Sequence, residues 1–442
     1  MATFKKVCTM AGNLPFQGLE RTHKMLGSIL NLLESYLCTK SIFCRKEFKM
    51  TFIFRFIVVS IFTALLLNGC STAAQKASSE RTAQTQAHAG YLGQEKYTGK
   101  YWPTKEWREC KPEAVGMNSD KLLQAIEYAA TPAFNTEGLV IVRKGHIVGE
   151  AYFGNFKINS RHVSHSMAKS FTSALVGIAI DKGQIKDIDE RICRYFKEWD
   201  CKDKDDLRSR ITIRHAMTLT TGLEWQENWS KWDPATNDAL KMGQSGRFIK
   251  YMGARKGLHE PGQRFYYSTG DPMLLSPVIQ AVTGVTAFEF ARQNLFKPLN
   301  ITNIDWEKDQ DGYTATAWGL NTTVRDYAKF GYLFLNKGYW EERKVVSEEW
   351  VEKSTKTDPS VKMWNGYGYL WHVNLPIRLS FSRSPISTAA IPPDGYMAEG
   401  VRGQNIFILP SKDLVIVRVA SQTRGAMDLV KFLTMVLSSI EN

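Results

Sequence analysis

The chain has 442 residues, of which 43% are hydrophobic, and a formal net charge of +13. This length is ample for a large hydrophobic core, in one composite domain or in several. The charge does not indicate nucleic-acid binding, because residues 1–70 hold nine Lys and Arg against three Asp and Glu. Beyond residue 70 no run of basic residues is interleaved with aromatic ones, so the composition points away from a nucleic-acid-binding protein.

The early part of the chain contains a segment organised like an export signal. Basic residues precede an apolar stretch at 56–67, which is too short to span a bilayer comfortably. The run Leu67-Asn-Gly-Cys70 resembles the bacterial lipobox, in which the cysteine is diacylated. The alternative is a buried strand that ends at an incidental cysteine. We expect residues 50–70 to be a lipoprotein signal peptide, with Cys70 as the lipidation site.

This expectation sets the domain organisation and the location of the protein. Residues 1–49 do not fit a signal peptide, and we interpret them as an upstream extension that precedes the true start at Met50. Residues 71–101 are polar and lack periodicity, which predicts a flexible tether. One catalytic domain would fill 102–442. The protein would be exported and lipid-anchored to the bacterial cell envelope, at the outer membrane in a Gram-negative host because Ser71 follows the cysteine.

Three of the seven cysteines fall in the predicted domain, at Cys110, Cys193 and Cys201. An oxidising environment allows Cys193 and Cys201 to pair, although the spacing leaves this open. No Cys and His spacing is typical of a zinc site, and we predict neither a metal nor a cofactor.

Within 102–442, apolar periodicity predicts strands near both ends and helices between them. The expected helices are 118–130, capped by Asn118, then 166–182, one beginning at 211, 288–295, 322–335 and 428–440. The expected strands are a hairpin over 139–153, then 366–373, 405–409 and 414–419. The strands from both ends would pair into one sheet, the middle would form a helical lobe, and a site would lie between them.

Ser166 and Lys169 form the only Ser-x-x-Lys motif in the chain, at the start of the helix predicted for 166–182. Residues three apart on a helix share one face, so the amine can contact the hydroxyl. A lysine that is neutral can take the proton of the serine and activate it as a nucleophile. In the first turn, the backbone N–H and the helix dipole would face an oxyanion on the substrate. The alternative is a pair that only caps and solvates the helix.

Two other segments contain candidate site residues. The loop at 261–271 carries Tyr266 and Tyr267, one of which we expect in the cleft. There the charge of Lys169 would lower the pKa of the phenol and let it join in proton transfer, unless the tyrosines only pack in the core. Gly400 and Gly403 precede the predicted strand at 405–409, and they either admit a ligand close to the backbone or form a bulge and a turn.

Four segments in this order resemble the class C β-lactamase-related serine hydrolases: 166–169, 211–223, 261–271 and 400–404. Within that superfamily the chain is most similar to the branch of 6-aminohexanoate-dimer hydrolases and family VIII-type carboxylesterases, over about 110–440. The resemblance implies an α/β fold of the β-lactamase/transpeptidase type. It would have an antiparallel sheet built from both chain ends, flanking helices and a mainly helical lobe.

The resemblance also implies a role for each matching residue. Ser166 would be the acylated nucleophile and Lys169 its base. Tyr267 would relay protons to the leaving group, whereas Tyr266 is one residue out of register and would pack. The backbone N–H groups of Ser166 and Val401 would form the oxyanion hole.

Two departures from the family pattern bear on the substrate. Thr269 stands where β-lactamases and penicillin-binding proteins have an Asn that grips the substrate amide. Ala398-Glu399-Gly400 replaces their Lys-Thr-Gly, so the lysine that meets a substrate carboxylate is absent. Arg402 is a candidate to substitute for that lysine, but Glu399 would oppose it. The residues expected to face the substrate are Thr269, Glu399, Gly400, Arg402 and Gln404.

We therefore predict a serine hydrolase that cleaves a small-molecule ester or amide through an acyl-enzyme. It would contact a membrane through its lipid anchor and would bind no nucleic acid, and the sequence predicts no oligomeric state. One alternative is a β-lactamase or D-Ala-D-Ala carboxypeptidase-like enzyme, which would need a cation in the third motif. The other is a non-catalytic envelope protein on the same fold, against which the intact Ser166, Lys169 and Tyr267 argue.

Overall fold

The structure, a computed structural model, describes residues 90–230, 232–382, 384–421 and 427–441. The expected extension at 1–49, the signal peptide at 50–70 with Cys70, and the tether up to residue 89 lie outside the described residues. In the described part of the chain, no single helix is long and apolar enough to cross a membrane. One helix pair bent by 70°, Asp271–Thr283 with Ala287–Phe296, meets the length and composition criteria together.

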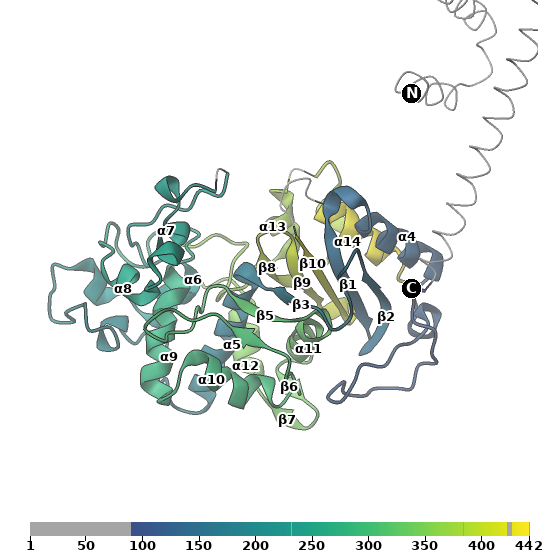
Figure 1. The fold of residues 1–442 in the computed structure, drawn as a ribbon, viewed down its shortest axis with the longest axis horizontal. Coiled ribbons are helices and arrows are strands. Elements are labelled where there is room, and N and C mark those ends of the chain that lie inside the picture. The colour runs from purple at the N-terminus through teal and green to yellow at the C-terminus, as the bar shows by residue number, and fades with distance from the viewer. Residues whose placement is uncertain (1–89, 231, 383, 422–426, 442) are drawn as a thin grey trace, which may run out of the picture. The chain divides into compact units, whose positions relative to one another are not determined.

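Strands from the two ends of the domain form one antiparallel five-stranded sheet (Figure 1). The strand order is β2-β1-β10-β9-β8. Their bounds are β1 Thr136–Arg143, β2 His146–Tyr152, β8 Tyr396–Gly400, β9 Gln404–Leu409 and β10 Leu414–Ala420. The predicted sheet, in which the chain ends pair, is confirmed: β1 lies beside β10 with Val140 opposite Val417.

Successive residues of β1 point to opposite faces of the sheet, and each face supports its own hydrophobic cluster. Leu139 and Ile141 pack on the outer face, whereas Val140 and Val142 pack on the inner face. The outer face is covered by α4 (Ser119–Ala129) and α14 (Leu429–Ser438), and the inner face by α5 (Ala168–Asp181) and α11 (Val324–Leu335).

The middle of the chain forms the helical lobe, which lies beside the sheet in Figure 1. Its helices are α6 Ile213–Thr218, α7 Asp238–Ser245, α8 Phe248–Gly253, α9 Leu275–Thr283 and α10 Ala287–Ala291. Outside this lobe are α12 Glu348–Ser354, α13 Leu375–Ser380, and the short strands β3 Arg161–Val163, β4 Asp305–Trp306, β5 Leu320–Thr323, β6 Tyr339–Trp340 and β7 Arg343–Lys344. α5 contacts both α9 of the helical lobe and β8 of the sheet, so its first turn lies where the two parts meet.

The capping residues that the sequence contains fix the helix starts as expected. Asn118 accepts a hydrogen bond from the Lys121 amide (3.0 Å) at the start of α4, and Thr323 accepts one from the Asp326 amide (3.1 Å) at α11. Each bond satisfies an amide that has no partner within its helix. The predicted hairpin turns at residues 144–145 between β1 and β2.

The strand predicted at 366–373 is wrong. This segment folds back on itself, because Leu370 has a φ of +61° and the Val373 amide donates to the Gly366 carbonyl (3.0 Å). Of its two isolated bridges, one pairs Tyr367 with His372 inside the segment, and the other joins His372 to Met397 of the neighbouring strand. Its aromatic side chains are buried in the same core cluster as the inner face of the sheet, where Trp371 packs against Tyr396 of β8. The strand that borders β9 is instead β8, which was not among the strands predicted from the sequence.

The domain begins earlier than the expected boundary at residue 102. Tyr91 and Gly93 lie along the outer edge of β2, where the Gly93 amide donates to the Val148 carbonyl (3.1 Å). The Glu150 amide donates back to the Tyr91 carbonyl (2.7 Å). Residues 91–93 therefore do not belong to the flexible tether, because the edge strand offers them backbone partners.

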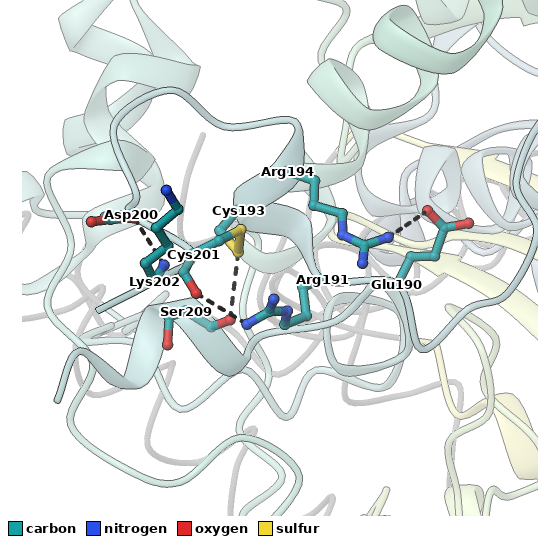
Figure 2. The surroundings of a disulfide bond; sticks show 8 residues. All are labelled: Glu190, Arg191, Cys193, Arg194, Asp200, Cys201, Lys202 and Ser209. Atoms are coloured by element: carbon teal, nitrogen blue, oxygen red, sulfur yellow. Dashed lines mark hydrogen bonds and ion pairs between the residues drawn. A yellow bond between two sulfur atoms is a disulfide. The ribbon is translucent and has the colours of Figure 1, made fainter. Parts of the chain in front are cut away.

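Cys193 and Cys201 form a disulfide at the edge of the helical lobe (Figure 2). The pairing that spacing alone left open is thus present, and Cys110 is a buried free thiol. Arg191 donates to the Cys201 carbonyl (3.1 Å) across the loop that the disulfide closes.

Candidate active site

Ser166 and Lys169 lie at the join of the sheet and the helical lobe. Ser166 is in a single 3₁₀ turn, His165–Met167, that leads directly into α5. Lys169 follows on the same face, and its Nζ lies 2.9 Å from the Ser166 Oγ. His165, just before the serine, has a φ of +46°, a conformation that non-glycine residues rarely adopt and that recurs at functional sites.

Lys169 is 2% exposed and is surrounded by acceptors. Besides the serine, its Nζ contacts the Thr269 Oγ1 (3.3 Å) and the Ala317 carbonyl oxygen (3.3 Å). Burial lowers the pKa of Lys169 to about 8, although the charges of Glu227 and Asp271 oppose this shift. A large fraction of Lys169 is therefore neutral near pH 8, where it can accept a proton.

Tyr267 completes the cluster, and Tyr266 does not. The Lys169 Nζ lies 5.2 Å from the centroid of the Tyr267 ring, which stacks on His372 at 6.4 Å. Tyr266 was expected to pack in the core, but its side chain is 39% exposed. The predicted lowering of the phenol pKa is wrong: burial, and then the charge of Glu227, raise the pKa of Tyr267. Tyr267 is thus a neutral phenol that can donate a proton, and Lys169 is the better base.

The third motif lies on β8 and its following turn, next to the serine. A side chain on Gly400 would meet the Ser164 carbonyl oxygen at 2.3 Å, so only glycine permits this close approach. Val401 and Ser166 line the same cavity. This places both residues that were expected to supply oxyanion-hole amides at one site.

Glu399 does not act as the unopposed acidic group that the sequence suggested. Its Oε2 lies 2.5 Å from the Arg378 Nη2 and 3.4 Å from the His372 Nε2. Burial alone would raise the pKa of Glu399, but Arg378 and His372 outweigh it and the pKa is lowered. Arg378, on α13, was missed because nothing in its local sequence indicates that it reaches the third motif.

The other two residues of this motif have different surroundings. The Arg402 guanidinium lies 4.9 Å from the centroid of a Trp232 ring, at the aromatic wall of the cavity. Gln404 is fully buried, and its amide donates to the Ala420 carbonyl (2.7 Å) and accepts from the Ala420 N–H (3.2 Å). Gln404 therefore holds the end of β9 against β10, and its side chain does not line the cavity.

The cavity above Ser166 has a volume of about 330 Å³ and a largely apolar lining. Three tryptophans stand in its wall: Trp229, Trp232 and Trp318. The sequence analysis missed them, because tryptophans in irregular segments carry no periodic signal.

Thr269 faces Lys169 on one side and Glu227 on the other. Its hydroxyl donates to the Glu227 Oε1 (2.7 Å) and its backbone N–H donates to Oε2 (2.7 Å). Glu227 was also missed in the sequence. Among the described residues, no group of three or more His, Cys, Asp or Glu side chains is arranged to hold a metal ion.

Comparison with known proteins agrees with this geometry. The sequence profile of the beta-lactamase family matches residues 129–433. The 6-aminohexanoate-dimer hydrolase of Paenarthrobacter ureafaciens is 23% identical over 334 residues, which cover 70% of this chain and 77% of that protein.

Two solved structures share the fold. EstCE1, described as a hydrolase with promiscuous acyltransferase activity, has 14% identity and a TM-score of 0.58 over 73% of this chain and 98% of its own. The octameric penicillin-binding protein homologue of Pyrococcus abyssi has 17% identity and a TM-score of 0.53 over 74% of this chain and 78% of its own. The family match spans both lobes, and the predicted fold and family resemblance are confirmed: the chain belongs to the beta-lactamase family, with the α/β fold of the β-lactamase-related serine hydrolases.

Proposed function

We propose that the protein hydrolyses an ester or a small amide through an acyl-enzyme on Ser166. The observation that carries this proposal is the 2.9 Å contact between the Ser166 hydroxyl and a buried lysine whose pKa is lowered to about 8. A lysine in this state can take the hydroxyl proton as the serine attacks.

In the acylation step, the Ser166 Oγ would attack the substrate carbonyl carbon while Lys169 accepts the hydroxyl proton. The backbone N–H groups of Ser166 and Val401 would hold the oxyanion that forms. As the carbonyl re-forms, the bond to the leaving group breaks, and Tyr267 would donate a proton to the departing oxygen or nitrogen. Lys169 would return a proton to Tyr267.

In the deacylation step, water would replace the leaving group and the same groups would act in reverse. A water molecule would lose a proton to the Tyr267–Lys169 pair and attack the acyl carbon. The bond from the acyl carbon to Oγ then breaks, and Ser166 regains its proton.

The lining of the cavity favours a substrate with an apolar group beside the reacting carbonyl. Tryptophans and aliphatic residues bury such a group, whereas Thr269 and Ala398 replace the Asn and Lys that would hold the amide and carboxylate of a β-lactam. The homologous hydrolase of 6-aminohexanoate dimer supports an amide as one substrate type, and the name of EstCE1 supports acyl transfer.

The test compares two substrates in the wild type and in Ser166→Ala. We expect kcat/KM for p-nitrophenyl butyrate to exceed that for nitrocefin by at least about tenfold, which is the effect of losing one charge-assisted contact. Ser166→Ala should abolish both reactions while its circular dichroism spectrum stays unchanged. Nitrocefin turnover equal to ester turnover would favour a β-lactamase, and an active Ser166→Ala protein would refute the mechanism.

We also propose that the protein is exported and anchored by a lipid on Cys70. The apolar stretch at 56–67 and the lipobox-like run support this, and the Cys193–Cys201 disulfide suits an oxidising compartment. When the gene is expressed from Met50 in a bacterial host, the protein should fractionate with membranes and incorporate labelled palmitate. Cys70→Ala should end the incorporation, and a soluble, unlabelled wild type would contradict the proposal.

A further inference from the structure

We propose that Glu227 is a positioning residue of the catalytic centre. Acting through the Thr269 hydroxyl, it would fix the direction in which neutral Lys169 presents its lone pair to Ser166. This inference rests on the proposed function, because it concerns how the base of that mechanism is oriented.

The first step concerns Glu227, whose carboxylate accepts four hydrogen bonds. Oε1 accepts from the Thr269 hydroxyl (2.7 Å) and the Trp229 indole N–H (2.9 Å). Oε2 accepts from the Thr269 backbone N–H (2.7 Å) and the Trp225 indole N–H (2.8 Å). Three of these donors are N–H groups that cannot act as acceptors, so the group at this position must be an acceptor on both oxygens. The single hydroxyl proton of Thr269 is thereby committed to Glu227.

The second step concerns Lys169, which has three polar neighbours. A neutral amine has two N–H donors and one lone pair. The Ala317 carbonyl can only accept, and the Thr269 oxygen, whose proton points to Glu227, can also only accept. Both N–H groups of Lys169 are then used, and the lone pair is left for the third neighbour, the Ser166 hydroxyl at 2.9 Å. This is the orientation that general-base catalysis requires.

The backbone holds the other acceptor in place. Thr172 of α5 donates to the Thr316 carbonyl (2.7 Å), which ties the segment carrying Ala317 to the helix of the nucleophile. Thr269 has no comparable tie for its hydroxyl rotor except Glu227. Without the carboxylate, the Thr269 hydroxyl could rotate and donate to the Lys169 lone pair, in competition with Ser166.

Glu227 also acts on Lys169 through its charge. The acidic groups that favour the protonated lysine are Glu227 and Asp271. The other charged groups nearby are balanced or neutral: Glu399 pairs with Arg378, and burial lowers the pKa of His372 to about 3. Burial likewise lowers the pKa of His165 to about 4. Removing the charge of Glu227 should therefore lower the pKa of Lys169 further.

Because Glu227 both orients Lys169 and affects its pKa, Glu227→Gln should change the rate plateau and the pH midpoint together. Glu227→Gln cannot accept four hydrogen bonds, because its amide nitrogen would face two donors. The rate plateau at high pH should then fall, since the lone pair is no longer directed, while the pH midpoint moves down because the charge is gone. A merely structural role predicts something else: a loosened site admits water, which would move the pKa of Lys169 back up toward its ordinary value.

The matched control is Glu307→Gln. Glu307 also accepts a hydrogen bond from an indole of the cavity wall, that of Trp318 (3.0 Å), and in the described part of the chain no hydrogen bond or ion pair joins it to Lys169. It therefore tests the loss of a carboxylate that holds a cavity tryptophan. Thr269→Val and Thr269→Ser test the hydroxyl itself, because both keep the charge of Glu227 and the backbone N–H.

The experiment measures the second-order rate of labelling of the full-length protein by a fluorophosphonate probe between pH 5 and 10. In this reaction the Ser166 Oγ forms a bond to phosphorus, fluoride leaves, and Lys169 takes the proton, so no natural substrate is needed. Glu227→Gln should lower the plateau about tenfold and move the midpoint down by at least about 0.5 pH unit. Glu307→Gln should leave the midpoint unchanged.

The threonine variants separate the orientation of the Lys169 lone pair from the effect of the Glu227 charge. Thr269→Val should lower the plateau without moving the midpoint down, Thr269→Ser should restore it, and the Glu227→Gln, Thr269→Val double variant should be no slower than Glu227→Gln alone. A midpoint for Glu227→Gln that stays in place or rises would overturn the inference. If Ser166→Ala is also still labelled, the proposed function itself fails, whereas an unlabelled Ser166→Ala confines the failure to Glu227.

Discussion

Two carboxylates flank the Ser166–Lys169 pair, one from the sheet and one from the helical lobe, and they are compensated in different ways. Glu399 on β8 forms an ion pair with Arg378 (2.5 Å) and lies 3.4 Å from His372. Glu227, in the helical lobe, accepts hydrogen bonds from a hydroxyl, an amide and two indoles, which are all neutral donors. Both raise the pKa of Tyr267, but only Glu227 supports the charged form of Lys169.

This difference shows that the sign of a side chain's charge does not by itself give its effect on a nearby site. The effect also depends on the groups that pair with the side chain. The charge of Glu399 is compensated by Arg378, so Glu399 is not the unpaired carboxylate that was expected to oppose Arg402. The charge of Glu227 is only solvated by dipoles, and its field reaches the lysine. The comparison can be tested at Lys169 and Tyr267, through the pH dependence of the rate, at the Arg378–Glu399 pair, and at the disulfide.

The largest effect should come from the pair of residues that both carboxylates influence. Lys169→Ala or Tyr267→Phe should each reduce kcat for p-nitrophenyl butyrate by roughly 10²–10⁴-fold, as for the loss of a general base or acid. The double variant should be little slower than the worse single one, because the two residues move the same protons. Multiplicative losses would show independent roles, and a larger loss in Tyr266→Phe would show that the wrong tyrosine was chosen.

The pH dependence of the wild type should follow from the pKa of Lys169. The neutral amine is the base, so kcat/KM should rise with pH and level off above a midpoint near 8. Two pH units below the midpoint the rate should be about one hundredth of the plateau, because the neutral fraction falls tenfold per unit. Steady-state kinetics from pH 5 to 10 measure this, and a rate that falls as pH rises through 8 would contradict the assignment of Lys169 as the base.

Removing the cation that compensates Glu399 should have a moderate effect. In Arg378→Met, the uncompensated carboxylate should raise the pKa of Tyr267 and make it a poorer acid, with a loss of about tenfold in kcat for each unit. Adding Glu399→Gln in the same chain should restore most of the rate. No recovery in the double variant would mean that Arg378 acts by packing or on the substrate directly.

The smallest effect on the rate should come from the disulfide, whose cysteines contact Arg191 and Ser209 rather than either carboxylate. Cys193→Ser with Cys201→Ser should lower the free energy of unfolding by about 2–3 kcal/mol, as expected for a closed loop of this length. The pH midpoint and kcat should change by less than about twofold. Urea denaturation and kinetics on the same preparation test this, and a displaced midpoint would show that the loop reaches the site.

Much of the fold could be predicted because its signals are local. The short apolar runs at 405–409 and 414–419 and the hairpin at 139–153 identify strands, and the capping residues mark helix starts. Ser166 and Lys169 are one turn apart, so their contact follows from helix geometry. The run at 366–373 failed for the opposite reason: a left-handed Leu370 is decided by packing, not by the pattern.

The rest of the site depends on contacts between segments far apart in the chain. Glu227 reaches Thr269 and Arg378 reaches Glu399 from loops or helices whose local sequences have no pattern that predicts these contacts. The Ala317 acceptor is a backbone carbonyl, which any residue could supply. The direction of the Tyr267 pKa shift also required structure, because burial outweighs the nearby lysine charge.

The central claim is that Ser166 carries the acyl group, and trapping that intermediate tests it most directly. The protein would be mixed with p-nitrophenyl butyrate, quenched in acid within milliseconds to seconds, digested and analysed by mass spectrometry. We predict a butyryl group on the peptide that contains Ser166, together with a burst of p-nitrophenol equal to the enzyme concentration, and neither in Ser166→Ala. A butyryl group on another residue, or steady turnover in Ser166→Ala, would contradict the account.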